Sequence, residues 1–375
     1  MAGLYIHIPF CRQKCHYCNF YSLASQKYVN QVVEALLQEI RLQKRYLGSE
    51  KLNTVYFGGG TPSLIGVGDV NRIIGLVHEV FDVADDAEIT LEANPDDINP
   101  TYLDELGTTL INRLSIGIQS FDDKDLSYLH RRHNGEKALS AIKQVLAKGF
   151  DNLSCDLIYG IPGASDETWT ENIKTLVNLK ISHISAYSLT VETGTSLDFL
   201  IKKGKYSAVD EEKTIAQFSI LMDMLEKHGY EHYEISNFSL PGKKSKHNSA
   251  YWTGEKYLGI GPSAHSFDGK SRQWNVSNIK TYLDFLQQGS LSFEKEILTK
   301  TQKYNEYILT SLRTSRGVDL NRITLDFGKK YHNHFLNESK PFTANGWLII
   351  DEQKATLTRL GKFFADQVAS GLFWV

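Results

Sequence analysis

The segment that decides how this chain is interpreted is FCRQKCHYCNF, residues 10–20, which directly follows the apolar run Gly3–Ile8. It places Cys11, Cys15 and Cys18 in a C-x3-C-x2-C spacing. Three thiolates on one short loop are suited to bind three irons of a [4Fe–4S] cluster, which leaves the fourth iron without a protein ligand. The sequence therefore predicts a β-strand that leads into a cluster-binding loop with one open iron.

The alternative for this loop is a structural zinc site in which His16 or His7 supplies the fourth ligand. Structural zinc sites usually draw two pairs of ligands from two separate loops, and no second Cys or His pair in the sequence matches this one. We therefore favour the cluster. An open iron is what the reductive cleavage of S-adenosylmethionine (SAM) requires, because the amino acid end of SAM chelates that iron.

The composition is that of an ordinary globular protein, with 375 residues, 41% apolar and 23% charged, and a net charge of −3. So balanced a charge argues against nucleic acid as the main partner. With only four cysteines, no disulfide framework is expected, and Cys155 is expected to be a buried free thiol. The sequence has no signal peptide and no long apolar run, which predicts a cytoplasmic protein and leaves peripheral membrane attachment through an acceptor protein open.

From residue 3 to about 190, short apolar runs alternate with longer amphipathic ones. Six runs are expected to be strands: Gly3–Ile8, Thr54–Phe57, Ala87–Ala93, Arg113–Ile118, Asn152–Tyr159 and His183–Leu189. Five stretches between them are expected to be helices: Tyr28–Arg45, Asp69–Phe81, Pro100–Leu106, Gly135–Lys148 and Glu167–Leu179. This α/β alternation predicts a partial (β/α)6 barrel of the TIM type, with its chemistry at the carboxyl ends of the strands. A flat doubly wound sheet would produce the same pattern and stays open.

The chain divides into three predicted domains. Residues 1–190 form the barrel core, and residues 191–300, with a helix near Asp210–His228, complete the barrel. Residues 301–375 are expected to form a C-terminal helical domain that is similar to a winged helix. Its expected elements are helices at Tyr304–Thr314, Leu320–Lys330 and Leu360–Ser370 and a hairpin at Gly346–Leu357. A packing role fits its near-neutral charge better than nucleic-acid binding.

Polar and glycine residues at the ends of predicted strands form a second group of candidates. The run YFGGGTP, residues 56–62, follows a predicted strand, and its consecutive glycines expose backbone groups to a ligand. Glu92, Gln119 and Asp156 each lie at a strand end, where an unpaired polar side chain costs energy. In a barrel these residues converge at the mouth, where Arg131 can meet a carboxylate. Together with the cysteine loop, they indicate a ligand site.

A third group lies in the run KHNSAYW, residues 246–252, which places His247 near Tyr251 and Trp252. Imidazole can ligate haem iron, and aromatic rings offer a porphyrin a flat apolar surface. His265, in a Gly-rich aromatic run, is the rival ligand. A structural histidine among core aromatic residues is the alternative, and these residues alone do not decide between the two interpretations.

Taken together, these motifs resemble the radical SAM superfamily. The likeness extends over nearly the whole chain, through YIHIPFC, the glycine triplet, LEANP, SIGIQSF, DLIYG, HNxxYW and the C-terminal domain. It is strongest to the coproporphyrinogen III oxidase-like branch, which holds oxygen-independent coproporphyrinogen III dehydrogenase and related haem chaperones. The resemblance implies that Cys11, Cys15 and Cys18 ligate the cluster and that haem contacts His247, Tyr251 and Trp252. It further implies SAM contacts from Tyr5, Tyr17, Gly59, Gly60, Thr61, Glu92, Gln119, Arg131 and Asp156.

Two departures from the dehydrogenase point to a chaperone. The dehydrogenase has a further cysteine two residues after the third, where this chain has Phe20, and a long segment ahead of its first strand. We therefore expect a protein that binds haem, the cluster and SAM and delivers haem to acceptor proteins, without dehydrogenase activity and without an assigned catalytic residue. The alternatives are oxidative decarboxylation of coproporphyrinogen III propionates and radical chemistry on another small substrate. An electron donor such as flavodoxin or ferredoxin is an expected partner, and a homodimer stays open.

Overall fold

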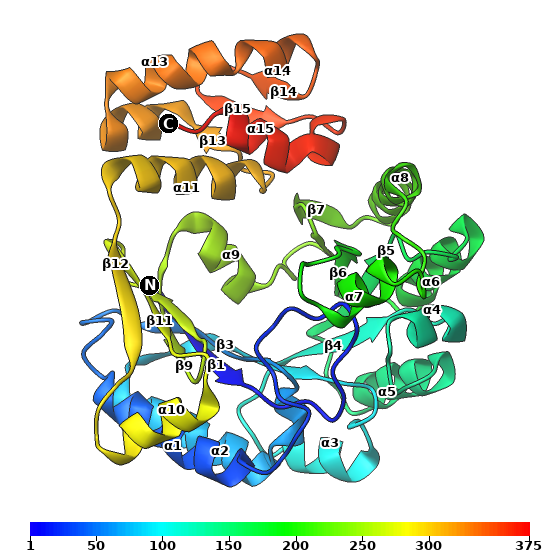
Figure 1. Cartoon of the computed structure of the whole chain (residues 1–375), viewed down its shortest axis with the longest axis vertical. Helices are drawn as coiled ribbons and strands as arrows, with labels where there is room; N and C mark the ends of the chain where they lie inside the picture. Colours follow the sequence, from blue (N-terminus) through cyan, green and yellow to red (C-terminus); the bar gives the residue numbers. More distant parts are fainter.

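Six parallel strands form the centre of the protein, whose computed structural model describes residues 1–375 (Figure 1). They are β1 Ala2–Ile8, β2 Leu52–Gly59, β3 Val83–Ala93, β4 Arg113–Gln119, β5 Leu153–Tyr159 and β6 His183–Ser188. Each strand pairs with the next in parallel. β1 and β5 are buried on both faces, which explains why they appear in the sequence as nearly continuous apolar runs. The predicted partial (β/α)6 barrel is confirmed.

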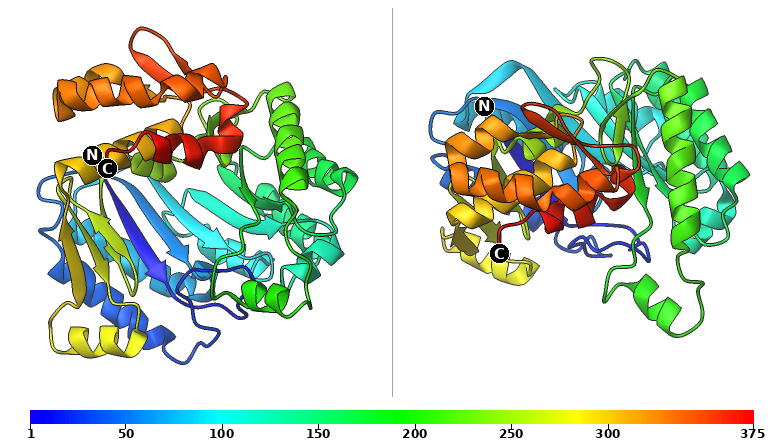
Figure 2. Two further views of the ribbon diagram at one scale, coloured as in Figure 1. Left: turned by 45° about the horizontal axis from the view of Figure 1, so that its top comes forward. Right: turned by 90° about the horizontal axis from the view of Figure 1, so that it is seen from above.

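Helices cover the outer face of this sheet (Figures 1 and 2). They are α1 Val29–Leu42, α2 Val67–Val80, α3 Pro100–Leu106, α4 Asp123–Tyr128, α5 Gly135–Ala147 and α6 Asp166–Asn178, with a short 3-10 turn η1 at Pro62–Leu64. In α1, Val32, Leu36 and Ile40 recur every four residues, so the helix has one apolar face, and that face is buried. The six strand–helix units therefore share one hydrophobic core.

Residues 191–300 extend the sheet at both edges. Their elements are α7 Ser196–Lys202, α8 Glu211–Lys227, β7 Glu231–Glu234, β8 Asn237–Ser239, α9 Lys246–Thr253, β9 Lys256–Ile260, β10 His265–Phe267, β11 Ser271–Asn275, α10 Ile279–Gln287 and β12 Phe293–Ile297. β9 pairs in parallel with β1, and β10 to β12 follow it in antiparallel order. β8 and β7 add to the other edge beside β6. α9 packs on β1 and β2 and lies beneath the C-terminal elements (Figure 1).

The C-terminal elements have a hydrophobic core of their own. They are α11 Lys300–Leu312, β13 Val318–Asp319, α12 Leu320–Arg322, the π-helical turn η2 Ile323–Phe327, α13 Lys329–Glu338, α14 Lys340–Ala344, β14 Leu348–Ile350, β15 Lys354–Leu357, the 3-10 turn η3 Gly361–Phe364 and α15 Ala365–Gly371. β14 and β15 form the predicted hairpin, and β13 adds a third strand to it. The boundaries of the three predicted domains stay a prediction.

The single helix predicted over Leu320–Lys330 is wrong. Gly328 has a φ of 92°, a left-handed value that no regular right-handed helix contains, and it separates η2 from α13. The π-helical turn before Gly328 and the new helix after it therefore replace one continuous helix. The helix is interrupted by the backbone conformation of Gly328, which the pattern of apolar residues does not reveal.

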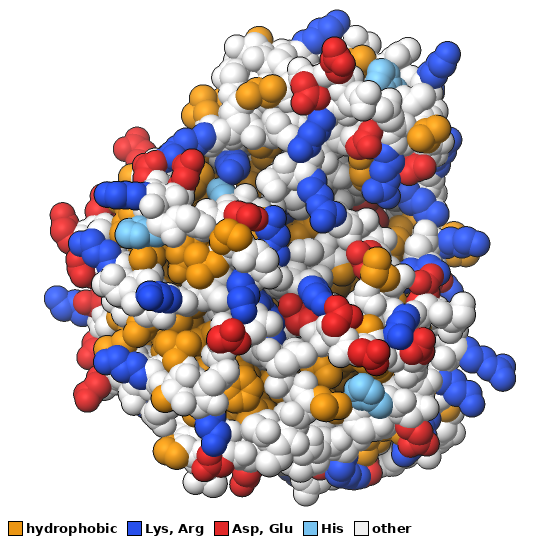
Figure 3. Space-filling view, turned by 180° about the vertical axis from the view of Figure 1, so that it is seen from behind, with side chains coloured by type: hydrophobic (Ala, Val, Ile, Leu, Met, Phe, Trp, Pro, Cys, Tyr) orange, Lys and Arg blue, Asp and Glu red, His pale blue; other side chains and the backbone are white.

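The surface carries no large area of one charge sign on the face shown in Figure 3, where basic and acidic side chains alternate. This mixture agrees with the net charge of −3. Among the helices described above, none combines the length and the apolar character needed to cross a bilayer.

Candidate functional site

The cysteine loop begins where β1 ends, at the carboxyl edge of the parallel strands. Its backbone is fixed at the base, because Cys11 N–H donates to Leu23 O at 3.0 Å and Leu23 N–H donates to Pro9 O at 2.8 Å. The thiols of Cys11, Cys15 and Cys18 are free and partly exposed. Three free thiols thus lie at the edge of the sheet where a partial barrel places its chemistry.

The surroundings of two thiols suit a cluster. The Thr61 hydroxyl donates to Cys11 Sγ at 3.6 Å, and the Arg131 guanidinium donates to Cys15 Sγ at 3.4 Å. Such hydrogen bonds stabilise thiolates and adjust the potential of iron–sulfur clusters. Burial raises the pKa of Cys11 and of Cys18, so bound iron would be needed to hold both as thiolates at neutral pH. The residues present therefore fit a [4Fe–4S] cluster.

The zinc alternative does not find its fourth ligand in His7. The His7 ring lies with Nδ1 3.1 Å from the Tyr5 hydroxyl and Nε2 2.9 Å from Tyr21 O, so both ring nitrogens already have partners. The His16 ring stacks on His130 with centroids 4.2 Å apart. No three or more His, Cys, Asp or Glu side chains of the structure are arranged to hold a single metal ion. Each thiolate of a cluster binds a different iron, so the cysteine sulfurs need not meet at one point.

The glycine triplet at the end of β2 packs directly against this loop. Gly59 has a φ of 107°, and a Cβ there would lie 2.5 Å from the His7 ring. A Cβ on Gly60 would lie 2.5 Å from Phe10 O. Glycine is therefore required here for close packing of the cysteine loop, in addition to any contact with a ligand. Thr61 follows at once and reaches Cys11 through its hydroxyl.

Glu92, near the end of β3, is a partly buried carboxylate. The Tyr56 hydroxyl donates to Glu92 Oε1 at 2.7 Å. The Glu92 pKa is raised to about 7, mainly by burial and in smaller part by the Asp156 carboxylate, while hydrogen bonds from Tyr56 and the Gly59 backbone oppose the rise. Because it accepts few hydrogen bonds, Glu92 has acceptor capacity left for a cationic ligand group. An aminium group in this position would satisfy it.

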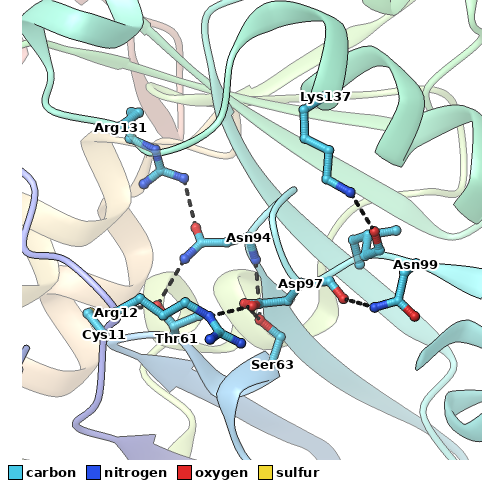
Figure 4. A network of polar contacts seen from close by, with 10 residues as sticks. Cys11, Arg12, Thr61, Ser63, Asn94, Asp97, Asn99, Arg131 and Lys137 are labelled. Atoms are coloured by element: carbon cyan, nitrogen blue, oxygen red, sulfur yellow. Dashed lines mark hydrogen bonds and ion pairs between the residues drawn. The ribbon is translucent and has the colours of Figure 1, made fainter. Parts of the chain in front are cut away.

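Asn94 connects the separate parts of the site and was missed in the sequence. The Arg131 guanidinium donates to Asn94 Oδ1 at 2.7 Å, and Asn94 Nδ2 donates to Thr61 Oγ1 at 3.0 Å (Figure 4). The chain of contacts Arg131–Asn94–Thr61–Cys11 thus links the loops that follow α4, β3 and β2 to the cysteine loop. Its signal in the sequence was available: Asn94 is two residues after Glu92 in LEANP, so the extended chain turns both side chains to the same side.

Gln119 is the last residue of β4, whereas Asp156, expected at a strand end, lies in the middle of β5. Gln119 has a φ of 69° beside a register shift between β4 and β5, and its amide lies near Arg131 across Gly117. Asp156 accepts from the Ser115 hydroxyl at 3.3 Å, and burial raises its pKa to about 6. Tyr17 lies at Cys15, and burial together with that thiol raises its pKa. The structure thus places most of the predicted SAM residues at or just after the carboxyl ends of the strands, with Tyr5 and Asp156 deeper in β1 and β5. Their individual roles stay predictions.

The predicted haem residues do not form one cluster. His247 is buried on the inner side of the sheet, with Nδ1 2.7 Å from Thr54 Oγ1 and Nε2 3.0 Å from the Tyr251 hydroxyl. Its ring stacks on Tyr56 with centroids 4.8 Å apart. Trp252 lies elsewhere, under the Arg313 guanidinium at 5.4 Å. His247 and Tyr251 therefore face the barrel, whereas Trp252 faces the C-terminal elements.

Two other predicted residues have clear positions. Cys155 is buried in β5, as expected, and burial raises its thiol pKa well above the usual value. His265, the rival haem ligand, is exposed and stacks on Trp274 with centroids 6.0 Å apart. The His247 imidazole stacks on Tyr56, whose hydroxyl in turn donates to Glu92.

Comparisons with known proteins agree with this geometry. A family model of the radical SAM superfamily matches residues 5–176, and one of the HemN C-terminal domain matches residues 298–364. The second match begins just after β12 and covers most of the C-terminal elements. The two matches therefore cover the first five strands with their helices and most of the C-terminal elements.

Relatives cover nearly the whole chain. The haem chaperone HemW of Bacillus subtilis (strain 168) is 33% identical over 372 residues, which span 98% of each chain. HemW of Mycobacterium tuberculosis (strain ATCC 25618 / H37Rv) is 33% identical over 377 residues, 99% of this chain and 94% of the relative. The solved structure of coproporphyrinogen III oxidase (HemN) from Escherichia coli, a radical SAM enzyme, shares the fold with a TM-score of 0.86 at 23% identity, over 99% of this chain and 90% of that chain. The chain therefore belongs to the radical SAM superfamily, in the HemN-like branch that includes HemW, and membership of that superfamily implies a [4Fe–4S] cluster and SAM.

Proposed function

We propose that this chain is a haem chaperone of the HemW type, which binds haem, one [4Fe–4S] cluster and SAM and delivers haem to acceptor proteins. The observation that carries the proposal is the 33% identity to HemW over 98% of both chains. It is supported by Phe20, which stands where the dehydrogenase has a further cysteine. Haem and a haem-accepting protein are then the principal partners, and an electron donor such as flavodoxin or ferredoxin serves the cluster.

In this proposal Cys11, Cys15 and Cys18 ligate the cluster, and Thr61 and Arg131 donate hydrogen bonds to its sulfur ligands. A cluster with one open iron supplies, when bound, the electron for reductive cleavage of SAM. Replacing any of the three cysteines with Ala should abolish the absorbance near ~400 nm of the anaerobically purified protein. Cys155→Ala is the matched control and should keep that absorbance, because the Cys155 thiol is buried inside β5.

The SAM residues divide by position. Glu92 and the backbone of Gly59 and Gly60 hold the amino acid end, because a carboxylate and exposed carbonyls accept from an aminium group. Arg131, held by Asn94 Oδ1 and Gly117 O at 2.7 Å each, presents a fixed positive charge at the same edge. Tyr5, Tyr17, Thr61, Gln119 and Asp156 complete the proposed set of SAM contacts.

For haem, the proposed contacts are His247, Tyr251 and Trp252. His247 can ligate iron only after its imidazole leaves Thr54 and Tyr251, so haem binding at this residue requires α9 to move. His265 has an exposed ring and is the necessary control. If His265→Ala loses haem affinity and His247→Ala does not, the axial assignment passes to His265 while the proposed function stands.

Coproporphyrinogen III dehydrogenase activity is the second candidate function, because the fold match to HemN covers 99% of this chain. One anaerobic assay separates the two. Reduced, reconstituted protein is incubated with SAM and coproporphyrinogen III, and protoporphyrinogen is measured. The proposal predicts no product above a Cys15→Ala control that lacks the cluster. Product formed over many turnovers would identify an enzyme and refute the chaperone.

A further inference from the structure

The structure contains a second site, a cavity between α9 and the C-terminal elements. Its volume is about 560 Å³, within the roughly 300–1,000 Å³ of small-molecule sites. One wall is the outer face of α9 with Trp252, and the opposite wall comes from α11, from the loop that follows it and from the turn before β15. None of the predicted cluster or SAM residues lines it.

The cavity is basic in a chain of net negative charge. Its lining contains the four basic residues Lys244, Arg316, Arg322 and Lys354 and a single acidic residue, Asp319. The Asp319 carboxylate is engaged, since it caps α12 by accepting from Arg322 N–H at 3.1 Å. Positive charge concentrated in a concave site attracts anions.

Two of these basic groups have no carboxylate partner. Lys354 Nζ donates only to Ser315 O, at 3.2 Å, and the exposed Arg316 makes no ion pair or side-chain hydrogen bond in the structure. Lys244 and Arg322, by contrast, pair with Glu231 and Asp326 outside the cavity. Arg316 and Lys354 are therefore free to bind an anionic ligand without breaking an existing ion pair.

Trp252 presents an aromatic side chain to the cavity. Its indole Nε1 is shielded from solvent and has no hydrogen-bond partner, and the same is true of Nε of Arg313, whose guanidinium lies over the indole ring. Unpaired buried N–H groups are rare in folded proteins, because each costs free energy. Because the indole nitrogen is shielded by the protein itself, a ligand in the cavity would contact the indole ring and not this donor.

The helical spacing explains why this face of the motif is separate from His247. Each residue of an α-helix is rotated by about 100° from the one before it. Side chains five positions apart therefore point in directions that differ by about 140°. Tyr251, four positions after His247, shares its face and binds it, whereas Trp252 turns away toward the cavity. The HNxxYW run thus presents His247 and Tyr251 on one side of α9 and Trp252 on the other.

We infer that this cavity binds the carboxylate edge of haem, with Arg316 and Lys354 as the anion-binding groups and Trp252 as the aromatic surface. The inference rests on the proposed haem function and adds its location and the part of the ligand recognised. Haem combines a flat aromatic ring with two propionates on one edge, which is the combination that the lining offers. No His, Cys or Met lines the cavity, so it recognises the propionates and does not ligate the iron.

The test compares haem with haem dimethyl ester, in which both propionates are blocked. Both are titrated into the full, anaerobically reconstituted chain and into Arg316→Gln, Lys354→Gln and the double variant. Arg45→Gln is the matched control, because Arg45 is an equally exposed arginine on the barrel side of the chain. The cluster absorbance of each variant serves as the check that the chain is folded.

The unmodified chain should bind haem at least about tenfold more tightly than the ester, because charge-assisted hydrogen bonds to carboxylates are lost in the ester. The double variant should lose this preference while its affinity for the ester stays unchanged, and Arg45→Gln should keep it. Equal binding of haem and ester by the unmodified chain, or an undiminished preference in the double variant, would overturn the inference and leave the haem function standing. No binding of haem at all would overturn both.

Discussion

Glu92→Gln should make the ligand-free protein more stable at alkaline pH while it abolishes tight binding of SAM. Burial raises the Glu92 pKa from 4.5 to about 7, which means that the folded protein holds this carboxyl protonated more strongly than the unfolded chain does. At 1.36 kcal/mol per pH unit, the ionised group costs about 3 kcal/mol of folding free energy. This cost is absent below about pH 4.5, grows between pH 4.5 and 7, and is complete above pH 7.

Glutamine keeps the oxygen that accepts from Tyr56 and removes the charge. The amide hydrogens of this glutamine would have fewer hydrogen-bond partners in the folded protein than in water. This loss costs about 1 kcal/mol of folding free energy and reduces the gain by that amount. The net expectation is a gain of about 2 kcal/mol at pH 8 and a loss of about 1 kcal/mol at pH 4.5, where only the amide cost remains, measured by urea unfolding of cluster-free protein. In the same variant the affinity for SAM should fall about 10- to 100-fold, because a charge-assisted hydrogen bond is lost.

Glu39 is the matched control, because burial also raises its pKa to about 7. Its carboxylate, however, accepts from the Tyr282 hydroxyl at 2.6 Å, Gly261 N–H at 2.8 Å and Asn275 Nδ2 at 2.6 Å. In Glu39→Gln the side-chain NH2 group would face one or more of these N–H and O–H donors, and hydrogen bonds would be lost. The variant should therefore show no net gain in stability. A loss of stability in Glu92→Gln at pH 8, or a gain that does not depend on pH, would refute the reasoning.

Two further substitutions test how the site is assembled. Gly60→Ala should lower the iron content of reconstituted protein, because its Cβ would lie 2.5 Å from Phe10 O and push the cysteine loop away; Gly68→Ala, with nothing within 4 Å, should not. Equal iron in the two variants would contradict this packing argument. Asn94→Ala should weaken SAM binding with the cluster retained, because Arg131 loses the oxygen that it contacts at 2.7 Å. Calorimetry that finds an unchanged Kd would remove Asn94 from the site.

Local patterns in the sequence located the parallel strands well, because each strand is a compact apolar run. The predicted strand Arg113–Ile118, for example, corresponds to β4, which extends one residue further, to Gln119. The pairing of β9 with β1 was not predictable in this way, since it joins Lys256–Ile260 to a strand some 250 residues earlier and depends on tertiary packing. Polar contacts such as those of Asn94 were likewise not assigned, because they depend on which side chains the strands bring together.

The orientation of the HNxxYW run was the largest difference between expectation and structure. Its glycine- and aromatic-rich surroundings concealed the helix α9, so His247, Tyr251 and Trp252 were expected to share one surface. The helix instead buries the imidazole of His247 against Thr54 and Tyr56 and turns Trp252 to the opposite side. The chemistry of the residue types was correctly recognised, whereas their arrangement required the backbone.

The most direct test of the proposed function is a haem titration of the purified full chain, followed through its Soret band. A haem chaperone should give a shifted Soret band that saturates at a defined stoichiometry, and the bound haem should remain with the protein on gel filtration. Trp252→Ala, which removes an aromatic surface without touching the cysteine loop, should reduce this affinity while the cluster absorbance is unchanged. A titration that stays linear and unshifted, like that of haem in buffer alone, would contradict the proposal that this protein carries haem.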